Sequence, residues 1–165
     1  MTLDKRWAEA EAAYVRALEI DPESLLMARN LESVLAQSGR PRPAILADLA
    51  ELRSIDTAVA KGDWSAHAVS RCARLLERRP TFLMARFLYG SLLLANQRAA
   101  EAALELERVI AVDGRRAAPR VNLGAAYAAL GRAAQAEAQF RAALAIDPTN
   151  TTARARLSAL GRTPK

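Results

Sequence analysis

Small and apolar residues recur along this chain at helical spacing, in stripes that short polar turns separate. Two stripes lie in residues 117–130 and 133–146, and the members of each share one helical face. Gly131 lies between them, where a left-handed residue commonly ends a helix. A helical hairpin is therefore predicted, with Gly124 and Ala136 as its close contact. The stripes consist of Leu123, Gly124 and Tyr127, and of Ala136, Phe140 and Ala143.

The stripe pattern returns at a period of 34 residues. A fixed period of this length is typical of stacked helical hairpins, because each hairpin leaves an apolar face that only a neighbouring hairpin covers. We therefore predict an all-α protein with further helices at about 64–79, 82–96 and 99–112. The equivalent positions are Tyr89, Gly90, Leu93, Ala102, Leu106 and Val109 in one repeat, and Ala68, Cys72 and Leu75 in another.

Residues 117–150 resemble the tetratricopeptide repeat family at these positions and in the closing Asp147-Pro148, with Arg120 where the family often has tryptophan. The resemblance covers most of the chain and is weakest at residues 40–62. It implies an α-solenoid, a right-handed superhelix of stacked hairpins. It also implies that the concave face, lined by the first helix of each hairpin, binds a peptide or a helix of another protein.

One domain is expected over residues 1–161, followed by a disordered tail at 162–165. A single apolar stripe predicts one unbroken helix over residues 43–61, with Asp63 as the N-cap of a helix that starts at Trp64. The expected parts of the domain are the helix of a partial repeat at 5–20, an irregular repeat at 24–62, regular repeats at about 49–82, 83–116 and 117–150, and a capping helix at 151–160.

The regular spacing fails near the N-terminus. Residues 5–20 have the pattern of a second helix, residues 25–37 that of the next first helix, and the helix at 43–61 follows directly. One second helix is therefore absent, and we expect the stack to change direction near Gly39 to Pro43. Self-association through this incomplete first repeat stays open. The matching residues, Ala10, Tyr14, Ala17 and Pro22 against Ala68, Cys72, Leu75 and Pro80, lie 58 positions apart, ten short of two periods.

Positive charge is the main bias of the composition. The chain carries a formal net charge of +6, almost wholly from arginine. A basic balance suggests nucleic acid, but these arginines are spread along every helix and are not interleaved with aromatic residues. We therefore expect a solvated surface rather than a nucleic-acid site.

Catalytic and metal-binding patterns are absent from the sequence. His67 and Cys72 are the single histidine and cysteine, and one of each cannot close a metal site without several carboxylates. We expect His67 on the surface and Cys72 as a buried apolar residue. No enzyme activity and no cofactor are predicted for the chain by itself.

No export signal and no membrane span are expected. Residues Met1 to Trp7 lack an apolar core, and the longest apolar run, Phe87 to Ala95, is too short to cross a bilayer. These observations favour a soluble, cytoplasmic protein and leave the compartment open.

The family resemblance also indicates which positions face the groove. They are Met84, Phe87, Leu88, Ser91 and Leu94 in one repeat, and Ala118, Val121, Asn122, Ala125 and Ala128 in the next. Family members that clamp a C-terminal carboxylate have lysine and asparagine where this chain has Phe87 and Ser91, so that mode is not expected. Because most of these side chains are apolar or small, we expect the groove to bind an apolar or amphipathic segment of a partner protein.

Arginines recur 34 residues apart at Arg86, Arg120 and Arg154. Successive first helices should each carry one, as a charged rim of the groove. Two interpretations stay open. The stems pack over each hairpin while the charged heads stay in water, or the ladder attracts an acidic segment of a partner.

Three classes of function remain. A protein-interaction scaffold is the leading one. The alternatives are a regulatory or docking segment of a longer enzyme or membrane-associated protein and, less favoured, a nucleic-acid-binding protein. The sequence names neither the partner nor the pathway.

Overall fold

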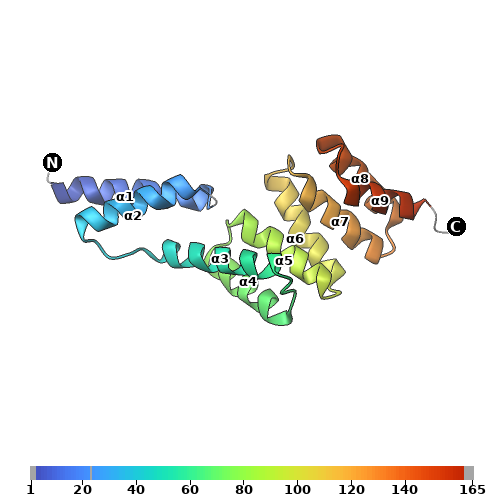
Figure 1. Ribbon diagram of the computed structural model, residues 1–165, viewed down its shortest axis with the longest axis horizontal. Helices are drawn as coiled ribbons and strands as arrows, with labels where there is room; N and C mark the ends of the chain where they lie inside the picture. The colour runs from blue at the N-terminus through green and yellow to red at the C-terminus, as the bar shows by residue number, and fades with distance from the viewer. Residues whose placement is uncertain (1–2, 23, 162–165) are drawn as a thin grey trace.

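The structure, a computed structural model, describes residues 3–22 and 24–161. These residues form nine α-helices joined by short turns (Figure 1). Every helix predicted from the sequence is present, with ends that differ by a few residues, so the all-α prediction is confirmed. The predicted disorder of residues 162–165 lies outside the described residues. The helices are α1 (Leu3–Ile20), α2 (Leu25–Ser38), α3 (Ala44–Ala60), α4 (Ala66–Arg78), α5 (Leu83–Ala95), α6 (Ala99–Val112), α7 (Ala117–Ala129), α8 (Ala133–Ile146) and α9 (Thr151–Leu160).

From α3 onward the helices stack as consecutive hairpins. α3 packs against α4, α5 against α6 and α7 against α8, and each second helix also packs against the first helix of the next pair. α9 packs against α8 and α7 and covers the end of the stack (Figure 1). One apolar core runs through these layers, because the stripe of each helix faces its neighbours.

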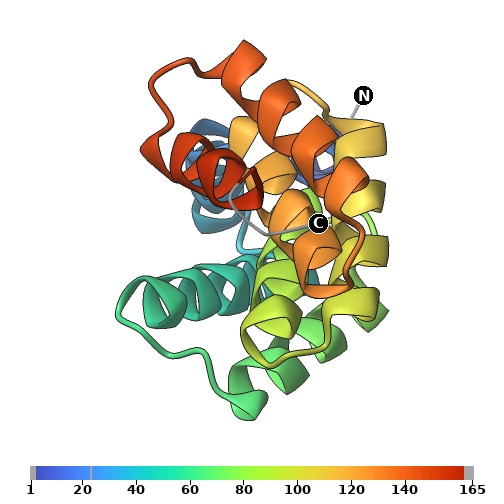
Figure 2. The ribbon, with the colours of Figure 1, turned by 90° about the vertical axis from the view of Figure 1, so that its right-hand side faces the viewer.

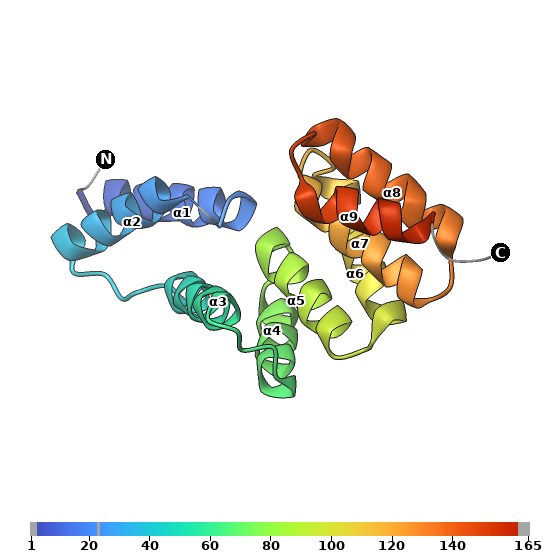
Figure 3. The same ribbon diagram turned by 45° about the vertical axis from the view of Figure 1, so that its right-hand side comes forward.

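The first two helices form a hairpin that departs from this regular order. α1 packs along α2 and touches α3, and residues 39–43 lead from α2 to α3 without helical structure. α2 and α3 run in opposite directions (Figures 1 and 3), as expected where one second helix is missing. The predicted unbroken helix at 43–61 is confirmed, because α3 has no turn between Arg53 and Thr57 and pairs with α4.

Asp48 is a buried charge that ties α3 to the end of α4. Its side chain is 8% exposed, and its two oxygens accept hydrogen bonds from Arg78 Nε at 2.9 Å and Arg79 Nε at 2.8 Å. Arg79 also pairs with Glu19 of α1, at 3.4 Å. Burial by itself raises the pKa of Asp48, but the hydrogen bonds from Arg79 and Arg78 outweigh it and hold the pKa below its usual value. The first hairpin is therefore joined to the stack by charge as well as by apolar contact.

In the three hairpins from α3 onward, the turn after the first helix contains a residue with positive φ: Gly62 (93°), Gln97 (62°) and Gly131 (72°). These residues mark the same point of three successive hairpins. The buried alanine that opens the stripe of the second helix follows five positions later in the last two hairpins and six positions later in the first. Residues of α3 therefore correspond to residues 35 positions later in α5, not 34. The three alanines are Ala68, Ala102 and Ala136.

The longer turn between α3 and α4 also changes how α4 begins. Trp64 lies in the turn rather than in the helix. The N-cap is Ser65, whose hydroxyl accepts a hydrogen bond from the Ala68 N–H at 3.3 Å. The prediction of Asp63 as the N-cap was wrong, because the Asp63 carboxylate accepts from the Ser65 N–H, at 3.1 Å, before the helix starts.

Gly124 allows α7 and α8 to approach each other closely. A Cβ atom on Gly124 would lie 2.6 Å from Cε1 of Phe140, closer than packed carbon atoms come. Gly90 has the same role in the preceding hairpin, where a Cβ atom would lie 2.9 Å from Cγ of Leu106. Ala136 is fully buried, but the Phe140 ring, and not Ala136 as predicted, lies nearest to Gly124.

Gln97 strains the turn between α5 and α6. Within the described residues it is the one side chain other than glycine held at positive φ, where a Cβ atom crowds the following carbonyl. Gln97→Gly should therefore raise the free energy of unfolding by about 0.5–1 kcal/mol and the Tm by about 1–4 °C in a thermal melt. Gly131→Gln, at the same point of the next turn, is the matched control and should lower the Tm. Equal melting of all three proteins would show that this turn position is not strained.

Candidate functional site

One hollow of about 800 Å³ opens along the first helices of the stack. α3 and α9 form its two outer walls, and α5 and α7 lie between them. In Figure 2, α3 (teal) lies below α9 (dark red) on the left-hand side of the molecule. The lining residues are Asp56, Val59, Ala60, Trp64, Phe87, Leu88, Ser91, Leu94, Ala95, Asn122 and Arg156.

Several of the residues predicted to face the groove line this hollow. Four of them lie on consecutive turns of α5, and the fifth comes from α7. The large apolar members make the middle of the hollow apolar, although one of them, Leu88, is only 4% exposed. The five are Phe87, Leu88, Ser91, Leu94 and Asn122. That they bind a partner stays a prediction.

The other predicted groove residues do not line the hollow. Val121 and Ala125 are buried. Met84 and Ala128 are half-buried against the core, and Ala118 is exposed outside the hollow. α7 packs between α5 and α9, so neighbouring helices occupy most of the face that it was expected to offer. The site is therefore corrected to one centred on α5, with little contribution from α7.

Sequence reasoning missed both outer walls of the hollow. Asp56 of α3 lies 35 residues before Ser91, so the longer α3–α4 turn hides this correspondence from a search at a period of 34. Arg156 of α9 lies 34 residues after Asn122, so the period alone could have identified it. It was missed because α9 was assigned only a covering role.

The polar groups between the walls are held by hydrogen bonds to each other. Asn122 Nδ2 donates to Ser91 Oγ at 2.8 Å. The Ser91 hydroxyl donates to the Phe87 carbonyl, also at 2.8 Å. These bonds connect α7 to α5, and they fix the backbone that carries the Phe87 ring.

Trp64 gives the hollow an aromatic edge. Its side chain remains 44% exposed although the turn that carries it is fastened to α5. The Asn96 amide nitrogen donates to the carbonyls of Trp64 and Leu92, each at 2.8 Å. The indole is therefore placed by a hydrogen-bonded turn, with much of its surface available to a partner.

The three arginines predicted as a charged rim have a different role. Each guanidinium group donates to the backbone carbonyl six residues earlier, in the turn before its own helix, and none of the three lines the hollow. Arg86 also forms an ion pair with Glu105 of α6. The prediction of a charged rim is therefore corrected. Each arginine instead fastens the turn before its own helix to that helix. The bonds run from Arg86 to Pro80 (2.6 Å), from Arg120 to Gly114 (3.2 Å) and from Arg154 to Pro148 (2.6 Å).

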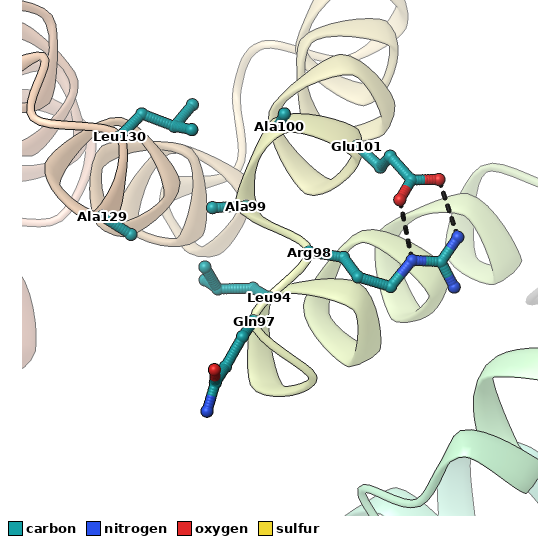
Figure 4. A pocket seen from close by; sticks show the side chains of 8 residues that line it. All are labelled: Leu94, Gln97, Arg98, Ala99, Ala100, Glu101, Ala129 and Leu130. Carbon is teal, nitrogen blue, oxygen red and sulfur yellow. Dashed lines mark hydrogen bonds and ion pairs between the residues drawn. The ribbon is translucent and has the colours of Figure 1, made fainter.

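A smaller hollow of about 450 Å³ lies beside the turn between α5 and α6 (Figure 4). Its charged groups already satisfy each other, because Arg98 and Glu101 form two hydrogen bonds of 2.7 Å. Figure 4 shows the Gln97 side chain pointing away from this pair. No unpaired charge on its lining points to a ligand within the described part of the chain.

His67 and Cys72, the single histidine and cysteine, line neither of the two hollows. His67 is exposed, and burial raises the pKa of the Cys72 thiol to about 12. Over residues 3–22 and 24–161, no group of three or more His, Cys, Asp and Glu side chains is arranged to hold a metal ion. None of the helices described is both long and apolar enough to cross a membrane.

Stacked hairpins with a hollow along their first helices define the class of the molecule as an α-helical repeat protein. The family model for the tetratricopeptide repeat matches residues 117–150. The helices upstream of this repeat stack on it in the same way. Residues 117–150 therefore belong to the tetratricopeptide repeat family, and the stack around them has the fold of such repeats.

Solved structures of the same fold agree with this assignment. The Arabidopsis OM64 tetratricopeptide domain is 19% identical, with a TM-score of 0.66, over 72% of this chain and 97% of that one. The second such domain of human RPAP3, in complex with the HSP70 peptide SGPTIEEVD, is 20% identical, with a TM-score of 0.63, over 70% and 96%. MamA from Desulfovibrio magneticus RS-1 is 20% identical, with a TM-score of 0.63, over 96% and 83%. No curated protein sequence matches the chain.

Proposed function

We propose that this protein is an interaction scaffold that holds an apolar or amphipathic segment of a partner protein in the hollow between α3 and α9. The observation that carries the proposal is an apolar surface at Trp64, Phe87 and Leu94, contributed by a turn and a helix and left uncovered in the described chain. Aromatic and aliphatic side chains grouped in a concave site are the usual anchors of protein recognition.

The chemistry of the hollow differs from that needed for an acidic peptide. One structural neighbour, the second RPAP3 domain, is seen with a peptide that ends in EEVD. Here the described residues that line the hollow include no lysine, and Phe87 and Ser91 stand at the positions where carboxylate-clamping repeats carry lysine and asparagine. An apolar anchor therefore suits this hollow better than a run of carboxylates does.

The segment is expected to present its anchors at helical spacing. Phe87, Ser91 and Leu94 lie on successive turns of α5. A helix of the partner that lies along α5 would therefore contact one of these residues at each turn. The five or so ångströms between turns match the spacing of anchors three or four residues apart on an amphipathic helix.

Phe87→Ala is expected to weaken partner binding by at least ~1 kcal/mol, because it removes the aromatic anchor at the middle of the hollow. Partners captured by a pull-down from the source cell would be measured by titration calorimetry against the parent and the variant. The helical circular-dichroism signal should stay unchanged, since Phe87 is half-buried and α5 keeps its other contacts.

Leu104→Ala is the matched control for this experiment. Leu104 is an exposed apolar residue on α6, a second helix, and does not line the hollow. Its removal should leave the affinity unchanged. Equal affinities for the parent and the Phe87→Ala protein would mean that the hollow is not where this protein binds.

A further inference from the structure

We propose that the hollow selects its occupant by charge order as well as by apolar contact. The partner segment carries a large apolar anchor, with a basic residue on the α3 side of this anchor and an acidic residue on the α9 side. This inference rests on the proposed function of the same hollow. It adds an orientation and a partner chemistry that an apolar surface alone does not specify.

The two outer walls carry opposite charges. Asp56 lies on the α3 wall and Arg156 on the α9 wall, so the row of first helices begins with a carboxylate and ends with a guanidinium group. Figure 2 shows the two helices one above the other on the same side of the molecule. A segment that spans the hollow meets both charges, one near each end.

Neither charge has a partner among the residues that the structure describes. Asp56 and Arg156 are both exposed and form no ion pair or hydrogen bond there. Several charged residues elsewhere on the stack are already paired, as Arg98 is with Glu101 and Arg71 with Glu51. Asp56 and Arg156 are not, so both charges are available to an occupant of the hollow.

The residues that line the hollow between Asp56 and Arg156 carry no charge, so nothing offsets the preference of these two residues for opposite charges on the occupant. Phe87 and Leu94 are apolar, and Ser91 and Asn122 satisfy each other by their hydrogen bond. A segment in the favoured order gains two attractive contacts, and the reversed segment meets two like-charge contacts. Exposed charge contacts of this kind each change affinity by about 1.5- to 2.3-fold, so the four contacts together should make the two orders differ by about 5–30-fold. A uniformly acidic segment gains at Arg156 but is repelled at Asp56.

The experiment uses a random peptide library displayed on phage and selected on the whole chain, with the Phe87→Ala variant as the counter-selection. We expect the enriched peptides to contain an aromatic or large aliphatic residue with a basic residue on one side and an acidic residue on the other. A synthetic copy of an enriched peptide should bind about 5–30-fold more tightly than the same peptide with its two charges exchanged. The difference should shrink as salt is added, because exposed charges are screened.

The charge swap D56K/R156E supplies the decisive comparison. Both side chains are exposed, so the fold should be retained, and circular dichroism checks this. Selection on the swapped protein should enrich the opposite charge order. The matched control is the swap R98E/E101K, which exchanges an ion pair outside the hollow and should leave the enriched order as in the parent.

The outcomes separate this inference from the function on which it rests. Peptides that need Phe87 but are acidic throughout, or whose charge order is the same on the parent and on D56K/R156E, would overturn the charge-order inference and leave groove binding in place. A selection that enriches the same peptides on the parent and on Phe87→Ala would overturn both.

Discussion

Gly124→Leu is expected to lower the free energy of unfolding by about 1–3 kcal/mol, because it overpacks the last hairpin. Even the first carbon of the new side chain would lie 2.6 Å from Cε1 of Phe140 and 2.9 Å from Cδ1. Phe140 is almost fully buried, so its ring has little room to move aside. The Tm should fall by about 2–4 °C for each kcal/mol, as measured by the helical circular-dichroism signal during heating.

Gly161→Leu is the control for this substitution. Gly161 has a helical φ of −71°, and the one atom that a Cβ would meet there is the Ser158 carbonyl oxygen at 3.9 Å, an ordinary contact. The control should therefore melt close to the parent. An unchanged Tm for Gly124→Leu would mean that α7 and α8 are free to separate at no cost, against the geometry described.

The second large effect is expected from Arg78→Ala combined with Arg79→Ala, which leaves the buried carboxylate of Asp48 without a partner. Removing the partners of a buried charge typically costs about 3–5 kcal/mol, because the remaining charge is neither hydrated nor paired. The contact of Arg79 with Glu19 is lost as well. Chemical denaturation at neutral pH should show this loss as a lower midpoint at an unchanged slope.

The pH dependence should differ in sign between the parent and this double variant. In the parent the pKa of Asp48 is lowered in the folded state, so its contribution is fully present above the unfolded pKa of about 4 and is lost as the pH falls through the folded pKa. In the variant, burial without the arginines raises the pKa of Asp48, so protonation on acidification should recover stability. Adding Asp48→Asn to the double variant should recover part of the stability at neutral pH. Equal pH profiles for the parent and the variant would show that Asp48 does not contribute through these arginines.

The helices could be predicted from the sequence because their apolar stripes are local and periodic. The unbroken α3 followed from its single apolar stripe, and the missing second helix followed from counting residues between equivalent positions. The contact of Gly124 with Phe140 did not follow, because spacing shows which residues share a face and not which one across the interface reaches farthest. A ring on the second helix fills space that the alanine next to it leaves empty.

The candidate site was predictable only where one helix decides it. Phe87, Ser91 and Leu94 lie on α5, and its exposed face follows from its own period. The prediction that Val121 faces the groove was wrong because α5 and α9 pack against α7 and bury this residue. The period of a single helix does not show which of its faces neighbouring helices cover. Asp56 was missed because the one additional residue in the α3–α4 turn places it 35 residues before Ser91 rather than 34.

The arginine ladder shows the opposite limit of sequence reasoning. The 34-residue spacing of Arg86, Arg120 and Arg154 was correct, but spacing cannot tell a long side chain that points toward the groove from one that folds back onto its own turn. The carbonyls of these turns lack helical partners, so a guanidinium group within reach donates to them instead of remaining in water. The 34-residue spacing of these arginines therefore reflects the turn before each first helix, whose backbone carbonyl needs a hydrogen-bond donor.

The hydrogen-bonded turn that places Trp64 at the edge of the hollow gives this protein an optical reporter of its own groove. Indole emission depends on contact with water, and a bound segment that covers the exposed Trp64 ring removes such contact. The other tryptophan, Trp7, lies on α1 and does not line the hollow, so its emission forms a constant background. The longer turn that hid this wall from the sequence period thus also carries the residue that makes occupancy of the groove visible without any label.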